Sequence, residues 1–125
     1  MRIMSNMDFL IVEGYFSKVN GDFTQEECNE LLDTIDFSKS IKVGDVKVKG
    51  YSKPQKVYLS DICTVIETNN IDYGGCIYGE LYIKLPRKKI DTLSDNNFEG
   101  IDLPDCYKVV INGEEMFFFP TLWLY

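Results

Sequence analysis

Residues 107–119, with the sequence YKVVINGEEMFFF, carry the strongest local signal for the fold of this chain. Two runs rich in β-branched and aromatic residues flank the dipeptide Asn112-Gly113. Both central residues of a type I′ turn need a positive φ, which Asn and Gly tolerate better than other residues. The segment therefore predicts a β-hairpin with a two-residue turn.

A two-residue turn fixes the register of the hairpin, so the side chains on each face can be assigned. One face suits a core layer, but the other is largely apolar where a sheet with one side in water would be polar. Either another layer covers that second face, or Phe117, Phe119 and Trp123 form a docking surface that is at least partly exposed. The core face holds Tyr107, Val109, Met116 and Phe118, and the second face holds Lys108, Val110, Phe117 and Phe119.

One amphipathic helix is expected over residues 24–36, approximately. Thr24 is placed to be the N-cap, and Glu27 three residues later completes a capping box. Phe23 and Cys28 have the spacing of a hydrophobic staple across this cap. The apolar stripe of the helix consists of Cys28, Leu31, Leu32 and Ile35, and the opposite face carries Glu26, Glu30 and Asp33.

Most of the remaining sequence favours strands, which predicts an α+β fold with a mainly antiparallel sheet in a single domain, residues 1–125. "FLIVEGYF" and "GGCIYGELYIKL" indicate strands, with Gly79 a candidate bulge. "IKVGDVKVKG" is typical of a hairpin around a Gly-Asp turn. Residues 60–68 are ambiguous between a strand and a short helix, and Ser60 as a possible N-cap tips the expectation toward the helix.

Composition narrows the classes of function. The chain has 125 residues, 45% of them hydrophobic, and no histidine. The absence of histidine removes Ser-His-Asp and Cys-His catalysis and the common histidine-ligated zinc and iron sites. We therefore expect a protein that is not an enzyme and that uses no cofactor.

The cysteines and the apolar segments indicate a cytoplasmic protein, in the host cytoplasm if a phage encodes it. No run is long enough for a membrane-spanning helix, and the first residues make a poor signal peptide. The four cysteines lack the paired spacing of a zinc site and are expected to be reduced core residues, and no metal site is expected. They are Cys28, Cys63, Cys76 and Cys106.

Charge is sorted into blocks along the chain, within a formal net charge of −7. Six carboxylates and no basic residue lie between Asn20 and Phe37. Such a block can be a solvated face, or it can recognise a basic partner and imitate the phosphates that the partner binds. Small acidic immunity proteins and phage anti-defence inhibitors of nucleic-acid-handling proteins work in this way. The expected contact residues are Glu26, Glu30, Asp33, Phe117, Phe119 and Trp123, and the aromatic hairpin is also a possible homodimer surface.

A second hypothesis rests on the basic block that follows. The segment "VKVKGYSKPQKVY" interleaves lysines with tyrosines, a pattern that suits stacking and backbone contacts with single-stranded nucleic acid. The acidic remainder of the chain opposes this interpretation. The residues it would use are Lys47, Lys49, Tyr51, Lys53 and Lys56.

Three stretches are weakly similar to the N-terminal part of iron- and 2-oxoglutarate-dependent alkylation-repair dioxygenases. They are "DFTQEECNELLDTI", "KPQKVYLSD" and "YGG". The chain departs from the family pattern at Gln55, where the family has Arg, and at Ser60, where it has Gly. It also lacks the family's iron-binding histidines, so the resemblance assigns no site residue here.

Overall fold

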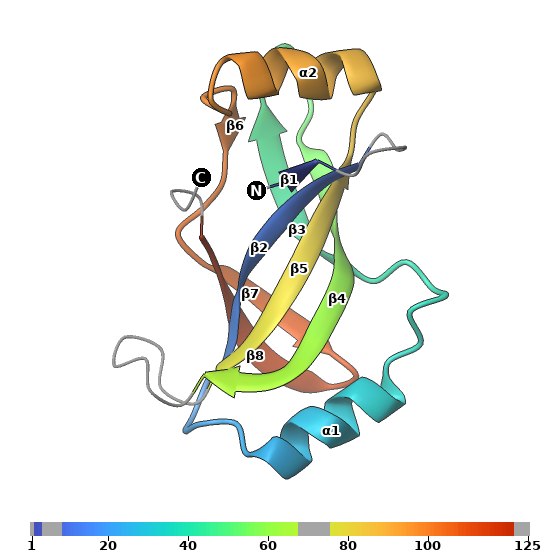
Figure 1. Ribbon diagram of the computed structural model, residues 1–125, viewed down its shortest axis with the longest axis vertical. Helices are drawn as coiled ribbons and strands as arrows, with labels where there is room; N and C mark the ends of the chain where they lie inside the picture. The colour runs from blue at the N-terminus through green and yellow to red at the C-terminus, as the bar shows by residue number, and fades with distance from the viewer. Residues whose placement is uncertain (1, 4–8, 68–75, 122–125) are drawn as a thin grey trace.

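The computed structural model describes residues 2–3, 9–67 and 76–121 and has an α+β fold with a mainly antiparallel sheet, as the sequence predicts (Figure 1). All strand pairs found within these residues are antiparallel. The elements are β1 (Arg2–Ile3), β2 (Phe9–Lys18), α1 (Gln25–Thr34), β3 (Lys42–Val48), β4 (Gln55–Glu67), β5 (Cys76–Lys84), α2 (Arg87–Asp95), β6 (Ile101–Asp102), β7 (Tyr107–Ile111) and β8 (Glu114–Pro120).

The sheet is strongly curled, with α1 across one end and α2 across the other (Figure 1). Its strand order is β6-β3-β4-β5-β2-β8-β7, and β1 pairs with β2 outside this path. The curl brings β7 back toward β3, where the Tyr107 hydroxyl donates a hydrogen bond of 2.9 Å to the backbone carbonyl of Asp45. The ring of Tyr107 lies against Gly44, where a Cβ would stand 2.6 Å from ring carbon Cδ1. Tyr107 therefore closes the curl through its side chain.

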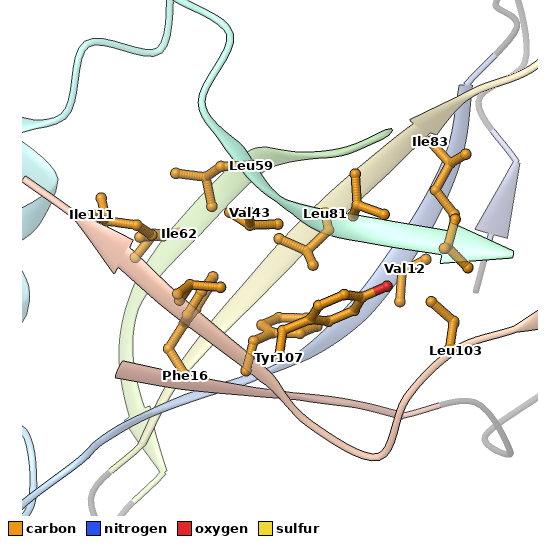
Figure 2. Packing of buried hydrophobic residues seen from close by; sticks show 14 of the residues in the cluster. Val12, Phe16, Val43, Leu59, Ile62, Leu81, Ile83, Leu103, Tyr107 and Ile111 are labelled. Carbon is orange, nitrogen blue, oxygen red and sulfur yellow. The ribbon is translucent and has the colours of Figure 1, made fainter. Parts of the chain in front are cut away.

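The hydrophobic core fills the inside of the curled sheet (Figure 2). Phe16 of β2 and Phe118 of β8 are fully buried, and their ring centroids lie 4.7 Å apart in an edge-on arrangement. A Cβ on Gly79 of β5 would stand 2.1 Å from Cε2 of Phe16. Gly79 is thus the residue that gives Phe16 its space in the core.

The predicted hairpin is confirmed. Asn112 and Gly113 have φ values of 50° and 80°, as a type I′ turn requires. The strand register pairs Val109 with Met116 and Tyr107 with Phe118, and these four side chains are buried. β8 lies between β2 and β7, so the hairpin is part of the main sheet.

The predicted helix is confirmed as α1. Its Thr24 N-cap hydroxyl accepts a hydrogen bond from the Glu27 amide at 3.2 Å, and the Glu27 carboxylate accepts one from the Thr24 amide at 3.1 Å. Phe23 and Cys28, the expected staple pair, are both buried. The capping box and the buried stripe together fix where the helix begins and which face meets the sheet.

Two expectations for the strands are wrong. Residues 60–67 form no helix: they belong to β4, which pairs along β5 with register shifts between Leu59 and Asp61 and again between Ile62 and Ile66. These irregularities lie in β4, opposite the part of β5 that contains Gly79. Gly44 and Asp45 form no turn, because β3 is one strand with a register shift between Lys42 and Gly44.

Helix α2 is absent from the sequence-based expectations. Its N-cap is Pro86, which provides no side-chain hydrogen bond. Basic residues occupy its first turn, where the helix dipole favours acids. The helix forms because Ile90 and Leu93 are buried against the core. No helix in the described part of the chain is long and apolar enough to cross a membrane.

Candidate interaction surfaces

The three predicted carboxylates of α1 are exposed. Glu26, Glu30 and Asp33 lie on the side of the helix opposite the buried Cys28 and Leu31. Within the residues that the structure describes, none of these three carboxylates forms an ion pair. Their charges therefore act on the solvent and on whatever approaches this end of the molecule.

A fourth carboxylate of the helix has a structural role. Glu27 pairs with the ammonium of Lys18 at the end of β2, and this contact lowers the pKa of the Glu27 carboxyl and raises the pKa of Lys18. The hydrogen bonds of the capping box lower the Glu27 pKa further. Glu27 therefore has two structural contacts: it completes the helix cap, and its ion pair with Lys18 of β2 holds α1 against the sheet.

A cleft of about 220 Å³ lies between α1 and the turn of the β7–β8 hairpin. Glu30 lines it from the helix and Glu114 from the hairpin. The Asn112 side chain donates a hydrogen bond of 3.1 Å to the Thr34 hydroxyl, which ties the turn to the end of the helix. The fold therefore brings the acidic helix next to the hairpin, while Glu26 and Asp33 lie outside the lining of the cleft.

The aromatic side chains of the hairpin lie on the outer face of the curled sheet. Phe117 and Phe119 are half-buried, with ring centroids 6.3 Å apart, and Val110 on the neighbouring strand is 57% exposed. The face is thus partly open to solvent: it is neither fully covered by another layer nor fully exposed as a docking surface. Trp123 lies outside the described residues.

The outer face carries more aromatic residues than the sequence reasoning identified. Tyr15 of β2 is paired in register with Tyr78 of β5 on one side and with Phe119 of β8 on the other. The rings of Tyr58 and Tyr82 stack with centroids 5.3 Å apart. The alternation in "FLIVEGYF" and "GGCIYGELYIKL" is the signal that could have placed Tyr15, Tyr78 and Tyr82 on one face.

Three carboxylates cross the same outer face in one row. Asp61 of β4 is paired in register with Glu80 of β5, and Glu80 with Glu13 of β2. Glu80 is only 7% exposed, and its carboxylate accepts a hydrogen bond of 3.4 Å from the Tyr78 hydroxyl. The outer face is therefore acidic as well as aromatic.

The basic candidate residues all lie on the surface, around the β3–β4 connection. The sheet register places Lys56 opposite Asp45 and Lys47 opposite Asp102, so acids offset part of this basic charge. Tyr51 is 37% exposed. The other members, Lys49 and Lys53, are exposed as well.

Lys89 of α2 joins this basic group, a contribution that the sequence reasoning missed. Its ammonium lies 5.6 Å from the centroid of the Tyr51 ring and donates a hydrogen bond to the backbone carbonyl of Lys49. Tyr51 therefore already has a cationic partner on its ring.

Neither Cys28 nor Cys106 forms a disulfide within the described part of the chain. Cys28 is buried in the core, and Cys106 is half-buried with a pKa raised by burial, the opposite of what an activated thiol needs. The side chains of Cys63 and Cys76 are outside the described part of the structure. Among the residues that are described, no three His, Cys, Asp or Glu side chains gather in a way that could hold a metal ion.

Comparisons of the chain with protein-family models, curated proteins and solved structures give no match.

Proposed function

We propose that this protein is a small acidic binding protein without enzymatic activity, of the inhibitor or immunity type, that blocks a basic nucleic-acid-handling protein. A phage anti-defence factor acting in the cytoplasm of its host is one member of this class. The observation that supports the proposal is the exposed row of carboxylates on α1, which form no ion pair within the described residues, beside the partly exposed aromatic hairpin.

The spacing of the carboxylates suits recognition of a basic surface. Glu26, Glu30 and Asp33 follow at intervals of four and three residues, which places neighbours about 5–6 Å apart along one helix face. Like charges at this spacing destabilise a helix by about 0.2–0.5 kcal/mol per pair. A partner with a complementary patch of Lys and Arg removes that repulsion, and the field of the row raises the rate of encounter.

The aromatic side chains supply the second part of the contact. Strand pairing fixes the backbone of Phe117 and Phe119, so covering their half-buried side chains costs no backbone ordering. Aromatic residues held in this way are typical of the energetic centre of protein interfaces. We infer that the acids steer the partner and that the aromatic face holds it.

Affinity capture from cells of the source organism, with a charge-reversed variant as comparison, tests this proposal. Glu26→Lys/Glu30→Lys/Asp33→Lys should lower recovery of a basic partner by at least about tenfold, because three attractive contacts become repulsive. The matched control reverses three exposed acids elsewhere and changes the net charge by the same amount. Equal loss in both variants would mean that total charge, rather than this helix face, governs binding. The control substitutions are Asp95→Lys, Glu99→Lys and Asp105→Lys.

Single-stranded nucleic acid is the alternative ligand, through Lys47, Lys49, Tyr51, Lys53 and Lys56. The exposure of these residues favours it, and the opposing Asp45 and Asp102 weaken it. A fluorescence-anisotropy titration with labelled oligonucleotides at low salt distinguishes the two functions. Binding that weakens steeply with added salt would support the alternative, and no binding would remove it.

A second copy of the chain is the alternative occupant of the hairpin face. Light scattering across a range of concentrations tests this, with Val110→Ser as the variant because Val110 is 57% exposed on that face. A dimer that dissociates in the variant would assign the face to self-association. A monomer at all concentrations would leave the face to a foreign partner.

A further inference from the structure

A pocket of about 310 Å³ lies at the outer face of the sheet, under the connection between α1 and β3. It is separate from the acidic cleft and from the basic group around Tyr51. The pocket has aromatic walls and a polar side. Phe9, Tyr82 and Phe37 form the walls, and Lys39, Ser40 and Ser60 line the polar side.

The aromatic walls are held in place by their neighbours. The Phe9 and Tyr82 rings meet with centroids 5.0 Å apart at an angle of 60°, and Tyr82 also stacks on Tyr58. Phe37 comes from the connection and is 42% exposed. A flat ring placed among these side chains would gain both apolar contact and ring-to-ring contact.

The connection that covers the pocket is bonded to the sheet at its β3 end and braced within itself near α1. The Ile41 carbonyl accepts a hydrogen bond of 2.8 Å from the Leu59 amide, which extends the β3–β4 pairing. The Asp36 carboxylate accepts hydrogen bonds from the Ser38 amide at 3.0 Å and from its hydroxyl at 2.5 Å. These bonds lower the pKa of Asp36. These bonds restrict the connection, which lowers the entropy that a bound ligand would cost.

The polar side of the pocket offers donors that no described residue uses. Within the described residues, the Lys39 ammonium forms no ion pair, and the side-chain hydroxyls of Ser40 and Ser60 form no hydrogen bond. Two acids are near the pocket in the chain, and neither lines it. Asp36 is already bonded to Ser38, and Asp61, which follows Ser60 in β4, accepts a hydrogen bond of 2.9 Å from the Ile62 amide. One ammonium and two hydroxyls together suit an anionic acceptor group.

The size of the pocket limits the ligand. An apolar cavity of about 150 Å³ is enough to hold benzene. A pocket of about 310 Å³ accommodates one such ring together with a polar substituent. We propose that this pocket binds a small aromatic anion, a single planar ring that carries a carboxylate or a phosphate group. The ring lies between Phe9, Phe37 and Tyr82, and its anionic group meets Lys39, Ser40 and Ser60.

A set of one-ring probes that differ in charge tests this assignment. Benzoate and phenyl phosphate carry the predicted anion, benzyl alcohol is neutral and benzylammonium is cationic. Titrations of the full chain followed by two-dimensional NMR should show saturable shifts at the pocket residues, with both anions tighter than benzyl alcohol by about tenfold. Benzylammonium should bind most weakly, and the order of benzoate and phenyl phosphate decides between a carboxylate and a phosphate ligand.

Two exposed positions separate the roles of charge and ring. Lys39→Gln should weaken both anions by about tenfold and leave benzyl alcohol unchanged. Phe37→Ala should weaken all the aromatic probes, and Lys53→Gln, an exposed lysine outside the pocket, should change none of them. The assignment is overturned if no probe saturates, if benzylammonium binds as tightly as the anions, or if Lys39→Gln has no effect. None of these results depends on the acidic surface proposed above.

Discussion

Tyr107 gives a quantitative test of how the curled sheet is closed. Tyr107→Phe keeps the ring against Gly44 and removes only the hydroxyl that donates to the Asp45 carbonyl. The loss of one such hydrogen bond should lower the free energy of unfolding by about 1 kcal/mol at pH 7. Urea denaturation followed by circular dichroism measures this change.

The pH dependence of the same pair of proteins sharpens the test. Burial, with a smaller contribution from the charge of Asp45, raises the pKa of Tyr107 from 10.0 to about 12. Because the folded-state pKa is raised, this stability is fully present below pH 10 and is lost as the pH rises toward 12. The rise of the Tyr107 pKa from 10.0 to about 12 corresponds to a loss of roughly 2.7 kcal/mol in the free energy of unfolding across this pH range. About half of that loss has occurred by pH 11.

The difference between the wild type and Tyr107→Phe isolates this group, because all other titrating groups are common to both chains. The wild type should be more stable by about 1 kcal/mol at pH 8, and this advantage should fall to about zero near pH 11. A difference that stays constant from pH 8 to pH 11 would refute the claim that the Tyr107 hydroxyl is buried against β3. A difference of zero at pH 8 would mean that the hydrogen bond from Tyr107 to Asp45 does not stabilise the fold.

Two further substitutions test the helix cap and the core. Thr24→Ala should lower the free energy of unfolding by about 1 kcal/mol, and Thr24→Ser should restore most of it in urea melts, because only the serine hydroxyl can accept from Glu27; equal stability of the two variants would contradict the cap. Gly79→Ala should lower stability by roughly 1–3 kcal/mol, since its Cβ would stand 2.1 Å from the Phe16 ring. In thermal melts a Phe16→Leu background should reduce that loss, and an equal loss in both backgrounds would place the strain elsewhere.

The parts of the fold that the sequence predicted are those determined by neighbouring residues. The turn chemistry of Asn112-Gly113 sets the hairpin register without reference to the rest of the chain. The capping box of Thr24 and Glu27 does the same for the start of α1. Exposure of the acidic side chains then follows from helical periodicity.

The errors arise where distant residues decide the structure. Ser60 offers a local helix cap, but Ile62 and its neighbours gain more by pairing with β5, so the segment is a strand. Helix α2 has no side-chain cap at Pro86 and forms through burial of Ile90 and Leu93. Packing against the core outweighs the weak local signal in that segment.

The candidate sites show the same division. Local patterns placed Phe117 and Phe119 on the outer face of the hairpin. The cleft between Glu30 and Glu114 depends on how α1 docks against the hairpin, which no local pattern reports. The pocket around Tyr82 needs Phe9, which the register of β2 with β5 brings close, and Phe37, which depends on the path of the α1–β3 connection over the sheet.

The proposed contact between the carboxylates of α1 and a basic partner can be measured directly. The most direct measurement is the dissociation constant of the captured partner, at several salt concentrations, for three proteins. They are the wild type, Glu26→Lys/Glu30→Lys/Asp33→Lys, and the matched reversal of Asp95, Glu99 and Asp105. If the carboxylates of α1 make the contact, only the helix variant loses at least about tenfold in affinity and most of the salt dependence. An unchanged affinity of the helix variant, or an equal loss in the matched control, would contradict it.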